Sequence, residues 1–562
     1  MRFLSALFAF WVFFLLSITS ATLYAQDLGN MKEQKPFTIH GSFNANLIGY
    51  NANGIDARQQ PFSYVLSANA TATFYGVELP FAFTYSNRQS DFSQPFNRFG
   101  LSPHYKWLTV HAGYRSVNFS SFTMSGHSFL GAGVEMNPGK FRFGFISGRF
   151  NRSTDPNTYD KVDTLPYYKR NGLAVKLGVG SNKSFVDLVF LKVQDDKSTI
   201  PYDTIYPGRT PEDNFVTGIN SKLAFSKYLF FEGEGAVSIF TDNQYAAEIT
   251  GEDAEKIKKF ENVILVNQSS RYFTALKASL VYKVKTFSLK AEYKRIDPGY
   301  KSLGTYYFST DLQSIAVGPS FSLFKKKLNI RGNIGLQSDN LKKTKKSTSK
   351  RTVGSANISY NPSQKFGIDG SYSNFSTSQK AGRIPLVDTS KIFQSNSNIT
   401  ISPRFTIMKP GYSHMLMLML NHTNLNDKNP VTEDITENKV NTVNLNYAVS
   451  LLDLKITITS GLNYMNMTNY IGSNKAMGIT AGIMGMVAKD KLMLGLTNSL
   501  MKTEYIGNKG KVFLTGFTVA YSLKKQHSFR FNTYFTGNYY AEDASVPSYK
   551  EFKGDLSYVY SF

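Results

Sequence analysis

The sequence contains no cysteine, and this absence excludes several kinds of structure. The chain can form no disulfide, no thiolate metal site and no lipid-modified cysteine anchor. A membrane-spanning helix needs about 20 consecutive, mostly apolar residues. No such run follows the amino-terminal segment, so we expect no helix to hold the exported chain in a bilayer.

Motifs that carry out catalysis are also missing. No Gly-x-Ser-x-Gly elbow occurs, and the acidic segments Asp155–Asp163 and Asp195–Asp196 with Asp203 lack EF-hand spacing. None of the histidines has the spacing of a metal-binding pair. They are His40, His104, His111, His127, His414, His422 and His527. We therefore predict that the protein is not an enzyme and that it has no cofactor and no metal site.

The amino-terminal segment is the one long apolar stretch. Arg2 is followed by an apolar run from Phe3 to Ile18, and Ala25 offers a cleavage position before Gln26. This layout predicts a secretory signal peptide over residues 1–25. Residues 26–36 are then expected to form a short periplasmic tail, and residues 37–562 a single domain.

Composition agrees with an exported chain built from strands. Aromatic residues make up 14% and charged residues 18%, while the formal net charge is +23. A basic chain often binds nucleic acid, but an exported protein rarely meets any. We therefore expect no nucleic-acid partner, and phosphorylated lipid head groups at the outer surface as the counter-charge.

The last residues, Tyr549 to Phe562, alternate between apolar and polar side chains. One face carries Phe552, Gly554, Leu556, Tyr558, Tyr560 and Phe562. The other carries Glu551, Lys553, Asp555, Ser557 and Ser561. Such alternation is typical of a strand with one apolar face, which a soluble edge strand would share.

The same pattern repeats along the whole chain and decides between these readings. Strands of ten to sixteen residues are joined alternately by tight turns and longer polar segments. The turns lie at Tyr75-Gly76, Lys106-Trp107, Asn137–Lys140, Ser181–Ser184, Ser226–Tyr228, Val284–Thr286, Lys325–Lys327, Asn361–Lys365, Lys409–Gly411, Leu452-Asp453, Lys489–Lys491 and Lys524-Lys525. This predicts an all-β, transmembrane, antiparallel up-and-down β-barrel with short periplasmic turns and long extracellular loops. We expect more than 20 strands, with 26 as the best count, and Asn97–Phe119, which contains Pro103, as the weakest pair.

The signal-peptide ending Tyr24-Ala25-Gln26 and the alternating last strand resemble large outer-membrane β-barrel proteins of Bacteroidota-type bacteria. The resemblance is to the general class and implies a place in the outer membrane of a Gram-negative cell. It also implies that Leu556, Tyr558, Tyr560 and Phe562 act as the signal for the barrel-assembly machinery. About eleven residues precede the first strand, so the plug domain of TonB-dependent transporters is not expected.

Methionines concentrate in one part of the chain, with eleven of 15 between Met408 and Met501. Extending the alternation places nine of them on the lumen face. They are Met415, Met417, Met419, Met465, Met467, Met484, Met486, Met493 and Met501. We interpret them as an adaptable surface for a plug subunit, an inserted loop or a passing substrate. The alternatives are that these methionines only add apolar side chains to both faces of the strands, or that their thioethers bind Cu(I).

Two outer segments have further features. The basic loop Leu341–Arg351 offers Lys342, Lys343, Lys345, Lys346, Lys350 and Arg351 to lipopolysaccharide phosphates, or it is a mobile, solvated tip. Residues Glu252–Phe260 are expected to form a helix that caps the barrel or folds into the lumen.

A barrel of this size encloses a wide lumen, and even 22-stranded barrels are plugged. We therefore expect a porin-like transport or secretion channel closed by its own loops, or by a plug or lipoprotein subunit. A non-transporting scaffold or an adhesion barrel is the alternative. The sequence does not name the solute or its direction.

Overall fold

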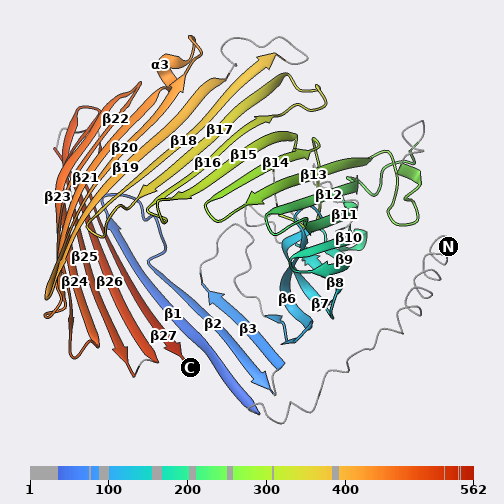
Figure 1. Ribbon diagram of the computed structural model, residues 1–562, viewed down its shortest axis with the longest axis horizontal. Coiled ribbons are helices and arrows are strands. Elements are labelled where there is room, and N and C mark those ends of the chain that lie inside the picture. Colours follow the sequence, from blue (N-terminus) through green and yellow to red (C-terminus); the bar gives the residue numbers. More distant parts are fainter. Residues whose placement is uncertain are drawn as a thin grey trace.

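The computed structural model describes residues 36–74, 77–87, 100–154, 167–200, 210–249, 257–306, 309–381, 392–524, 526–541, 544 and 546–562. Within them the chain forms a closed antiparallel β-barrel of 26 strands (Figure 1). This confirms the predicted fold class and the predicted count. No helix among these residues has the length and apolar character needed to cross a lipid bilayer.

The strands of the first half are β1 (Phe37–Asn53), β2 (Phe62–Phe74), β3 (Val77–Ser86), β4 (Gly100–Leu101), β5 (His104–Tyr105), β6 (Leu108–Ser120), β7 (Met124–Met136), β8 (Phe141–Asn151), β9 (Arg170–Ser181), β10 (Ser184–Asp195), β11 (Asp213–Ala224), β12 (Leu229–Thr241) and β13 (Ser270–Lys283). Those of the second half are β14 (Phe287–Ile296), β15 (Leu312–Leu323), β16 (Leu328–Ser338), β17 (Ser347–Tyr360), β18 (Phe366–Ala381), β19 (Phe393–Lys409), β20 (Tyr412–Asp427), β21 (Asn438–Leu451), β22 (Ile456–Asn469), β23 (Gly472–Val487), β24 (Leu492–Tyr505), β25 (Asn508–Leu523), β26 (His527–Tyr540) and β27 (Tyr549–Ser561). Two short helices, η3 (Lys197–Thr199) and α3 (Glu433–Thr436), lie in loops.

The short segments β4 and β5 share one position in the wall, so 27 labels describe 26 strands. Both pair with β3 and with β6, and Ser102 and Pro103 separate them. Proline donates no backbone hydrogen bond, which interrupts the ladder there. The predicted weak pair is therefore the position where the wall is interrupted.

The first and last strands close the ring. They pair antiparallel from Ser42 with Ser561 to Asn53 with Lys550. Beyond this register, the Gly41 amide donates to the Phe562 carbonyl oxygen at 2.9 Å, and the Phe562 amide donates to the Gly41 oxygen at 3.1 Å. Both backbone edges are thereby satisfied.

Tight turns and longer loops alternate around the two rims as the sequence predicts. Eleven of the twelve predicted turns fall between strands, and Tyr75-Gly76 lies outside the described residues, as does Lys525. Three connections on the loop side of the strands are short instead of long: residues 470–471, residues 506–507, and residues 121–123, which join β6 to β7. The predicted signal peptide and nearly all of the predicted tail, residues 1–35, also lie outside the described residues.

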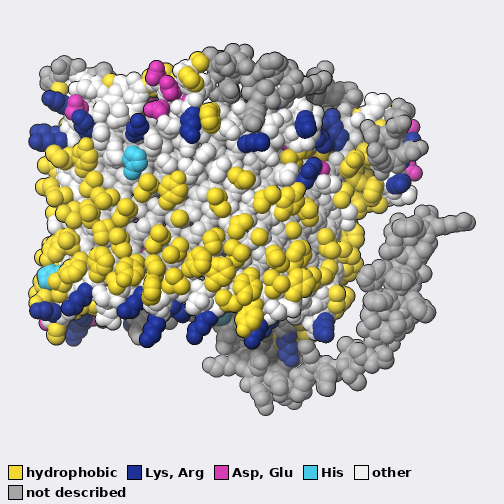
Figure 2. Space-filling model, turned by 45° about the horizontal axis from the view of Figure 1, so that its top comes forward, with side chains coloured by type: hydrophobic (Ala, Val, Ile, Leu, Met, Phe, Trp, Pro, Cys, Tyr) yellow, Lys and Arg dark blue, Asp and Glu magenta, His cyan; other side chains and the backbone are white. Residues whose placement is uncertain are grey.

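Side chains alternate between an apolar outer face and an inner face. On the side of the barrel that Figure 2 shows, the apolar side chains of the outer face form a continuous hydrophobic band. On β8 to β13 the inner face is apolar as well. On the outer face Leu188 is 46% exposed, whereas Leu191 and Ile146 on the inner face are fully buried. Inner side chains can be buried only if another part of the chain covers them.

The predicted helix Glu252–Phe260 lies partly outside the described residues. Its described end packs through Ile257 and Phe260 against Ile239 and Phe215. Ile239 and Phe215 are register partners and continue the outward row of Val237, which is 37% exposed. The described end of this segment therefore lies on the outer face of the barrel, and for that end the alternative of folding into the lumen is wrong.

Candidate functional site

The strands β6 and β7 leave the barrel wall halfway along their length. β6 pairs with β4 and β5 only up to Gly113, and β7 pairs with β8 only from Leu130 onward. Residues 114–129 pair with each other, with register shifts around Asn118. Such bulges bend a hairpin away from its neighbours. We name residues 114–129 the inner hairpin.

The inner hairpin covers the apolar inner face of the wall. It buries Val117, Phe119, Phe122, Met124 and Phe129. These side chains share one cluster with Ile146, Phe150, Ala174, Val189, Leu191, Val193, Val216, Ala236, Phe240, Phe273, Ala275, Ile296, Tyr300 and Leu303. Each fully buried large apolar side chain stabilises this arrangement by about 1.5–3 kcal/mol. The hairpin is thus firmly seated against β8–β14.

Two glycines of the wall make room for the hairpin. A Cβ atom at Gly144 would lie 2.7 Å from the Phe119 ring, and one at Gly218 would lie 2.6 Å from the Thr123 hydroxyl oxygen. Both distances are shorter than van der Waals contact, so larger residues would push the hairpin off the wall.

The tip of the inner hairpin is fixed to the wall by polar contacts. The Glu234 carboxylate of β12 accepts from the Ser121 amide at 2.8 Å, from the Ser120 hydroxyl at 3.2 Å and from the Ser121 hydroxyl. The Asn220 side-chain amide of β11 donates to the Phe119 carbonyl oxygen at 3.1 Å. Hydrogen bonds to a charged group contribute about 1.5–3 kcal/mol each.

The β14–β15 loop, residues 297–311, covers the hairpin from the loop rim. The Tyr300 hydroxyl donates to the Phe122 oxygen at 2.8 Å, and the Ser302 hydroxyl donates to the Thr123 oxygen at 2.6 Å. The Ser125 amide donates to the Gly304 oxygen at 3.1 Å. Burial in this contact raises the pKa of the Tyr300 hydroxyl, which therefore stays neutral. Loop and hairpin form one packed body.

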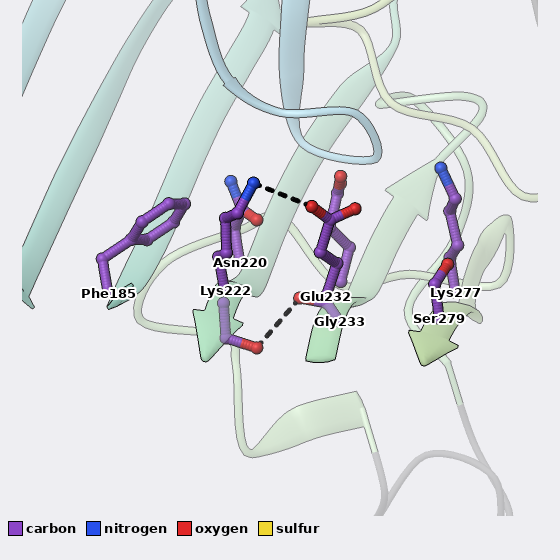
Figure 3. Close-up of a pocket in the computed structure, with 9 residues that line it drawn as sticks. Phe185, Asn220, Lys222, Glu232, Gly233, Lys277 and Ser279 are labelled. Carbon is purple, nitrogen blue, oxygen red and sulfur yellow. Dashed lines mark hydrogen bonds and ion pairs between the residues drawn. The ribbon is translucent and has the colours of Figure 1, made fainter. Parts of the chain in front are cut away.

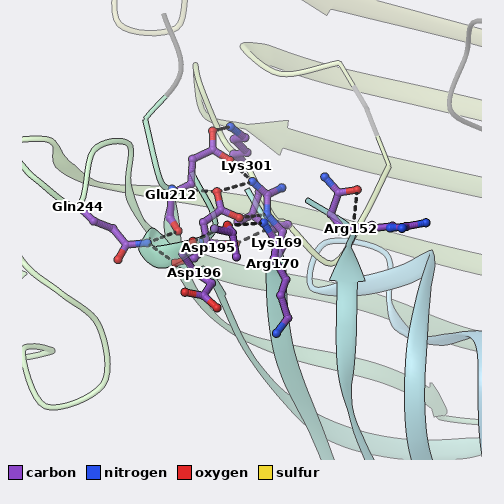
Figure 4. A network of polar contacts seen from close by, with 12 residues as sticks. Arg152, Lys169, Arg170, Asp195, Asp196, Glu212, Gln244 and Lys301 are labelled. Atoms are coloured by element: carbon purple, nitrogen blue, oxygen red, sulfur yellow. Dashed lines mark hydrogen bonds and ion pairs between the residues drawn. The ribbon is translucent and has the colours of Figure 1, made fainter. Parts of the chain in front are cut away.

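An ionic network joins four loops above this body (Figure 4). The Arg170 guanidinium donates to Asp195 at 2.7 and 2.9 Å and to Glu212 at 2.7 Å. Lys301 of the β14–β15 loop pairs with Glu212, and the Gln244 amide donates to the Asp195 and Glu212 carbonyl oxygens at 3.0 and 2.8 Å. Planar, bidentate pairs of this kind fix geometry as well as charge. The network ties these loops together at the loop rim.

A cavity of about 160 Å³ lies below the hairpin tip (Figure 3). Lys222, Glu232 and Lys277 extend from neighbouring strands toward the tip, and Lys222 pairs with Glu232 at 2.9 Å. Most of the residues that line it have polar or charged side chains. The residues are Phe185, Asn220, Ser221, Lys222, Glu232, Gly233, Glu234, Lys277 and Ser279. This side of the lumen therefore carries charged side chains of both signs.

The nine methionines singled out from the sequence lie on the inner face. Met417 is opposite Arg404 and Asn446, whereas the neighbouring Leu418 is opposite Leu445. The nine divide into two groups. Met415, Met417, Met419, Met484, Met486 and Met493 lie in the half of the wall near the turns, and Met465, Met467 and Met501 lie nearer the loops. Near the turns, β21 and β22 separate the three methionines of β20 from those of β23 and β24, so the nine do not form one continuous patch.

The six basic residues proposed for lipopolysaccharide do not form one loop. Lys350 and Arg351 belong to β17, pair with Ser338 and Gln337, and so point to opposite faces. Lys342, Lys343 and Lys346 are exposed in the loop. Lys345 pairs with Asp311.

Asp311 fixes this loop. Its carboxylate accepts from the Leu341 amide at 2.8 Å. Burial raises the pKa of Asp311, but the hydrogen bonds from Lys345 and from the Leu341 and Asn340 amides outweigh burial, and the pKa lies below its usual value. The carboxylate is therefore ionised, as the ion pair requires.

The histidines are dispersed in this architecture. His111 lies between Ser102 and Glu135, at 2.8 and 3.3 Å, and His414 contacts the Tyr447 hydroxyl. In the part of the chain that the structure describes, no three His, Asp or Glu side chains are gathered as metal ligands.

Comparison with known proteins adds only distant likenesses. No protein-family model matches the chain, and no curated protein matches its sequence. Solved structures similar to it include three barrels. Pseudomonas aeruginosa OprD is 13% identical, with a TM-score of 0.30, over 63% of this chain and 90% of its own. The siderophore receptor PiuA of Acinetobacter baumannii is 10% identical, with a TM-score of 0.39, over 93% and 82%. The translocation pore of the P pilus usher PapC is 9% identical, with a TM-score of 0.39, over 93% and 99%.

All three TM-scores are below 0.5, so these likenesses carry no argument about activity. The strand pairing of the chain itself defines the class: a large, closed, antiparallel β-barrel with an apolar outer band.

Proposed function

We propose that the protein is an outer-membrane transport or secretion channel whose lumen is narrowed by the inner hairpin. The main observation in support is that residues 114–129 leave the wall and bury their apolar side chains on its inner face. A hairpin that served only to complete the wall would pair with β8 along its whole length. A segment seated on the inner face of the wall narrows the lumen and thereby limits what passes through it.

The proposed orientation follows the asymmetry of the two rims. In outer-membrane barrels short turns lie in the periplasm and longer loops lie outside. Both ends of the barrel, Phe37 and Phe562, are at the turn rim and are therefore periplasmic. The proposal includes cleavage of residues 1–25 and insertion by the assembly machinery through Leu556, Tyr558, Tyr560 and Phe562. It also includes a Bacteroidota-type origin.

The wider part of the lumen is assigned to the substrate or to a separate plug or lipoprotein subunit. The two methionine groups supply flexible, polarisable contacts on a wall otherwise rich in Asn, Ser and Thr. Contact of Lys342, Lys343 and Lys346 with lipopolysaccharide phosphates remains part of this proposal.

The test uses the absence of natural cysteine. Thr123→Cys with Gly218→Cys places two thiols where the hairpin tip meets β11: a Cβ atom at residue 218 would lie 2.6 Å from the Thr123 hydroxyl oxygen, too close for an unbonded contact but within the reach of a disulfide. The conductance of single barrels in planar bilayers is recorded before and after reduction. We expect small or no steps in the oxidised variant and larger steps after reduction, whereas each single-cysteine variant responds to neither treatment.

Equal conductance of the oxidised and reduced forms contradicts gating by the hairpin. Silence of every form, together with a partner that co-purifies in stable ratio, assigns the barrel to the scaffold class instead.

A further inference from the structure

The turn rim carries an excess of positive charge that the loop rim does not share. Every one of the eleven described turns has at least one lysine in it or, for Lys409, directly beside it. These fourteen lysines are Lys106, Lys140, Lys183, Lys227, Lys285, Lys325, Lys326, Lys327, Lys365, Lys409, Lys455, Lys489, Lys491 and Lys524, and all of them are exposed. The same turns contain two acids, Asp453 and Asp490. We name these lysines the lysine collar.

The connections at the loop rim are balanced in charge. Their described residues include twelve basic side chains, Arg58, Arg152, Lys169, Lys197, Lys258, Lys259, Lys301, Lys342, Lys343, Lys345, Lys346 and Lys428. They also include twelve acids, Asp56, Asp196, Glu212, Asp242, Glu248, Glu261, Asp297, Asp311, Asp339, Glu433, Asp434 and Glu437. A general excess of lysine therefore does not explain the collar.

Turn geometry does not require lysine either. Several collar residues have a positive φ, among them Lys325 at 54° and Lys489 at 57°. Glycine and asparagine adopt this conformation at lower cost. Lysine at such positions provides a positive charge, although glycine or asparagine would adopt the positive φ with less strain.

The collar encircles the barrel at the edge of its apolar band. Figure 2 shows basic side chains following one another along the lower edge of the hydrophobic surface. Aromatic pairs lie close to the same edge, such as Phe37 with Phe74 and Phe287 with Phe321, at ring-centre distances of 4.8 and 4.9 Å. From the middle of the barrel toward the turn rim, the apolar band is followed by aromatic rings and then by flexible cations. This order matches that of the acyl chains, the interface and the charged head groups in one leaflet.

We propose that the lysine collar binds the phosphate groups of anionic phospholipids in the leaflet at the turn rim. The inference rests on the proposed membrane channel and adds the lipid class that surrounds it. The even spacing around the circumference favours a lipid annulus over a protein partner, which would need its charges gathered in one patch. Basic residues beside an anionic leaflet attract it individually and add together.

The experiment uses Trp107, which lies within the collar in the β5–β6 turn. The chain has two tryptophans, and Trp11 lies in the proposed signal peptide, so Trp107 is the only reporter in the mature chain that starts at Gln26. The mature chain is reconstituted in phosphatidylcholine vesicles that contain brominated phosphatidylglycerol or, separately, brominated phosphatidylcholine at the same mole fraction. Bromine quenches Trp107 only when the labelled lipid is adjacent.

We expect brominated phosphatidylglycerol to bind about threefold or more tightly than brominated phosphatidylcholine, with a preference that high salt weakens. The variant K106Q/K140Q/K183Q/K227Q, in the turn of Trp107 and the next three turns along the chain, should lose the preference. The matched control K258Q/K259Q/K343Q/K346Q removes four exposed lysines from the loop rim and should retain it.

Equal quenching by the two lipids in the parent protein overturns the proposal. An equal loss of the phosphatidylglycerol preference in both variants also overturns it. Retention of an acidic periplasmic protein by the collar, without lipid preference, assigns the surface to that protein instead. Conductance is recorded separately: a silent barrel with intact lipid preference refutes the channel, and a conducting barrel without preference refutes the collar.

Discussion

At the scale of single residues, Glu234 decides whether the inner hairpin stays seated. It is one acceptor for three donors from Ser120 and Ser121, and it lies beside the lumen cavity. The neighbouring Glu232 pairs with Lys222 and, among its described contacts, touches no hairpin residue. The two carboxylates on one strand therefore have different roles.

Glu234→Ala should loosen the hairpin tip without unfolding the barrel. The three donors lose their acceptor, which destabilises the seated state by about 1–3 kcal/mol. We expect hydrogen exchange of residues 117–125 to accelerate by about tenfold, since 1.4 kcal/mol corresponds to a factor of ten. Glu232→Ala is the matched control and should leave that exchange unchanged. Similar acceleration in both variants would show that the local charge matters rather than these contacts.

At the scale of elements, the seam between β1 and β27 shows how one strand serves two environments. Leu47 and Leu556 are register partners on the apolar face. On the other face the Asn46 amide donates to Asp555 at 3.2 Å, and the Tyr50 hydroxyl contacts Glu551. The side-chain faces that the sequence predicted for the last strand are therefore those of the structure. Its role as an assembly signal stays a prediction.

Leu556→Arg and Ser557→Arg form a matched pair on this strand. Leu556 lies on the apolar outer face, where a cation at mid-membrane costs about 2–4 kcal/mol. Ser557 points to the lumen, where water solvates the new charge. We expect the free energy of unfolding in vesicles, measured by urea titration, to fall for Leu556→Arg only. Equal destabilisation by both substitutions would contradict the assignment of faces.

The inner hairpin is the element that sequence reasoning missed. One signal for it was present: Phe185–Val193 is apolar at nearly every position, so both faces of β10 need cover. Its outward row includes Leu188, and its inward row includes Val189, Leu191 and Val193. The sequence does not show which segment supplies the cover, because Val117–Met124 alternates much like a wall strand.

At the scale of the whole molecule, the lumen is divided between two kinds of wall. The β8–β14 side is filled by the inner hairpin and the β14–β15 loop, whereas β19–β24 present Asn, Ser, Thr and methionine toward the interior. The loop-rim network around Arg170 holds the filled side together. Among the described residues no hairpin covers the β19–β24 side, which is why the proposed function assigns that side to a solute or a partner.

Met417→Cys and Leu418→Cys test this division, since the chain has no cysteine of its own. The register places Met417 on the inner face and Leu418 on the outer apolar face. In reconstituted vesicles a charged methanethiosulfonate reagent should modify Met417→Cys at least about tenfold faster, because a thiolate forms only in water. Equal rates would mean that the lumen at this height is closed to water or that the two faces are exchanged.

The sequence by itself determined the wall of this protein. The alternation of side chains, the turn residues and the even spacing of strands are local properties, and they were sufficient for 26 strands, eleven turn positions and the pairing of the two ends. The tertiary structure decided what fills the lumen. The inner hairpin, the β14–β15 loop and Glu234 meet across more than a hundred residues of chain, from Ser121 to Glu234. Such contacts depend on which inner surfaces the closed ring brings face to face, and no local pattern encodes that.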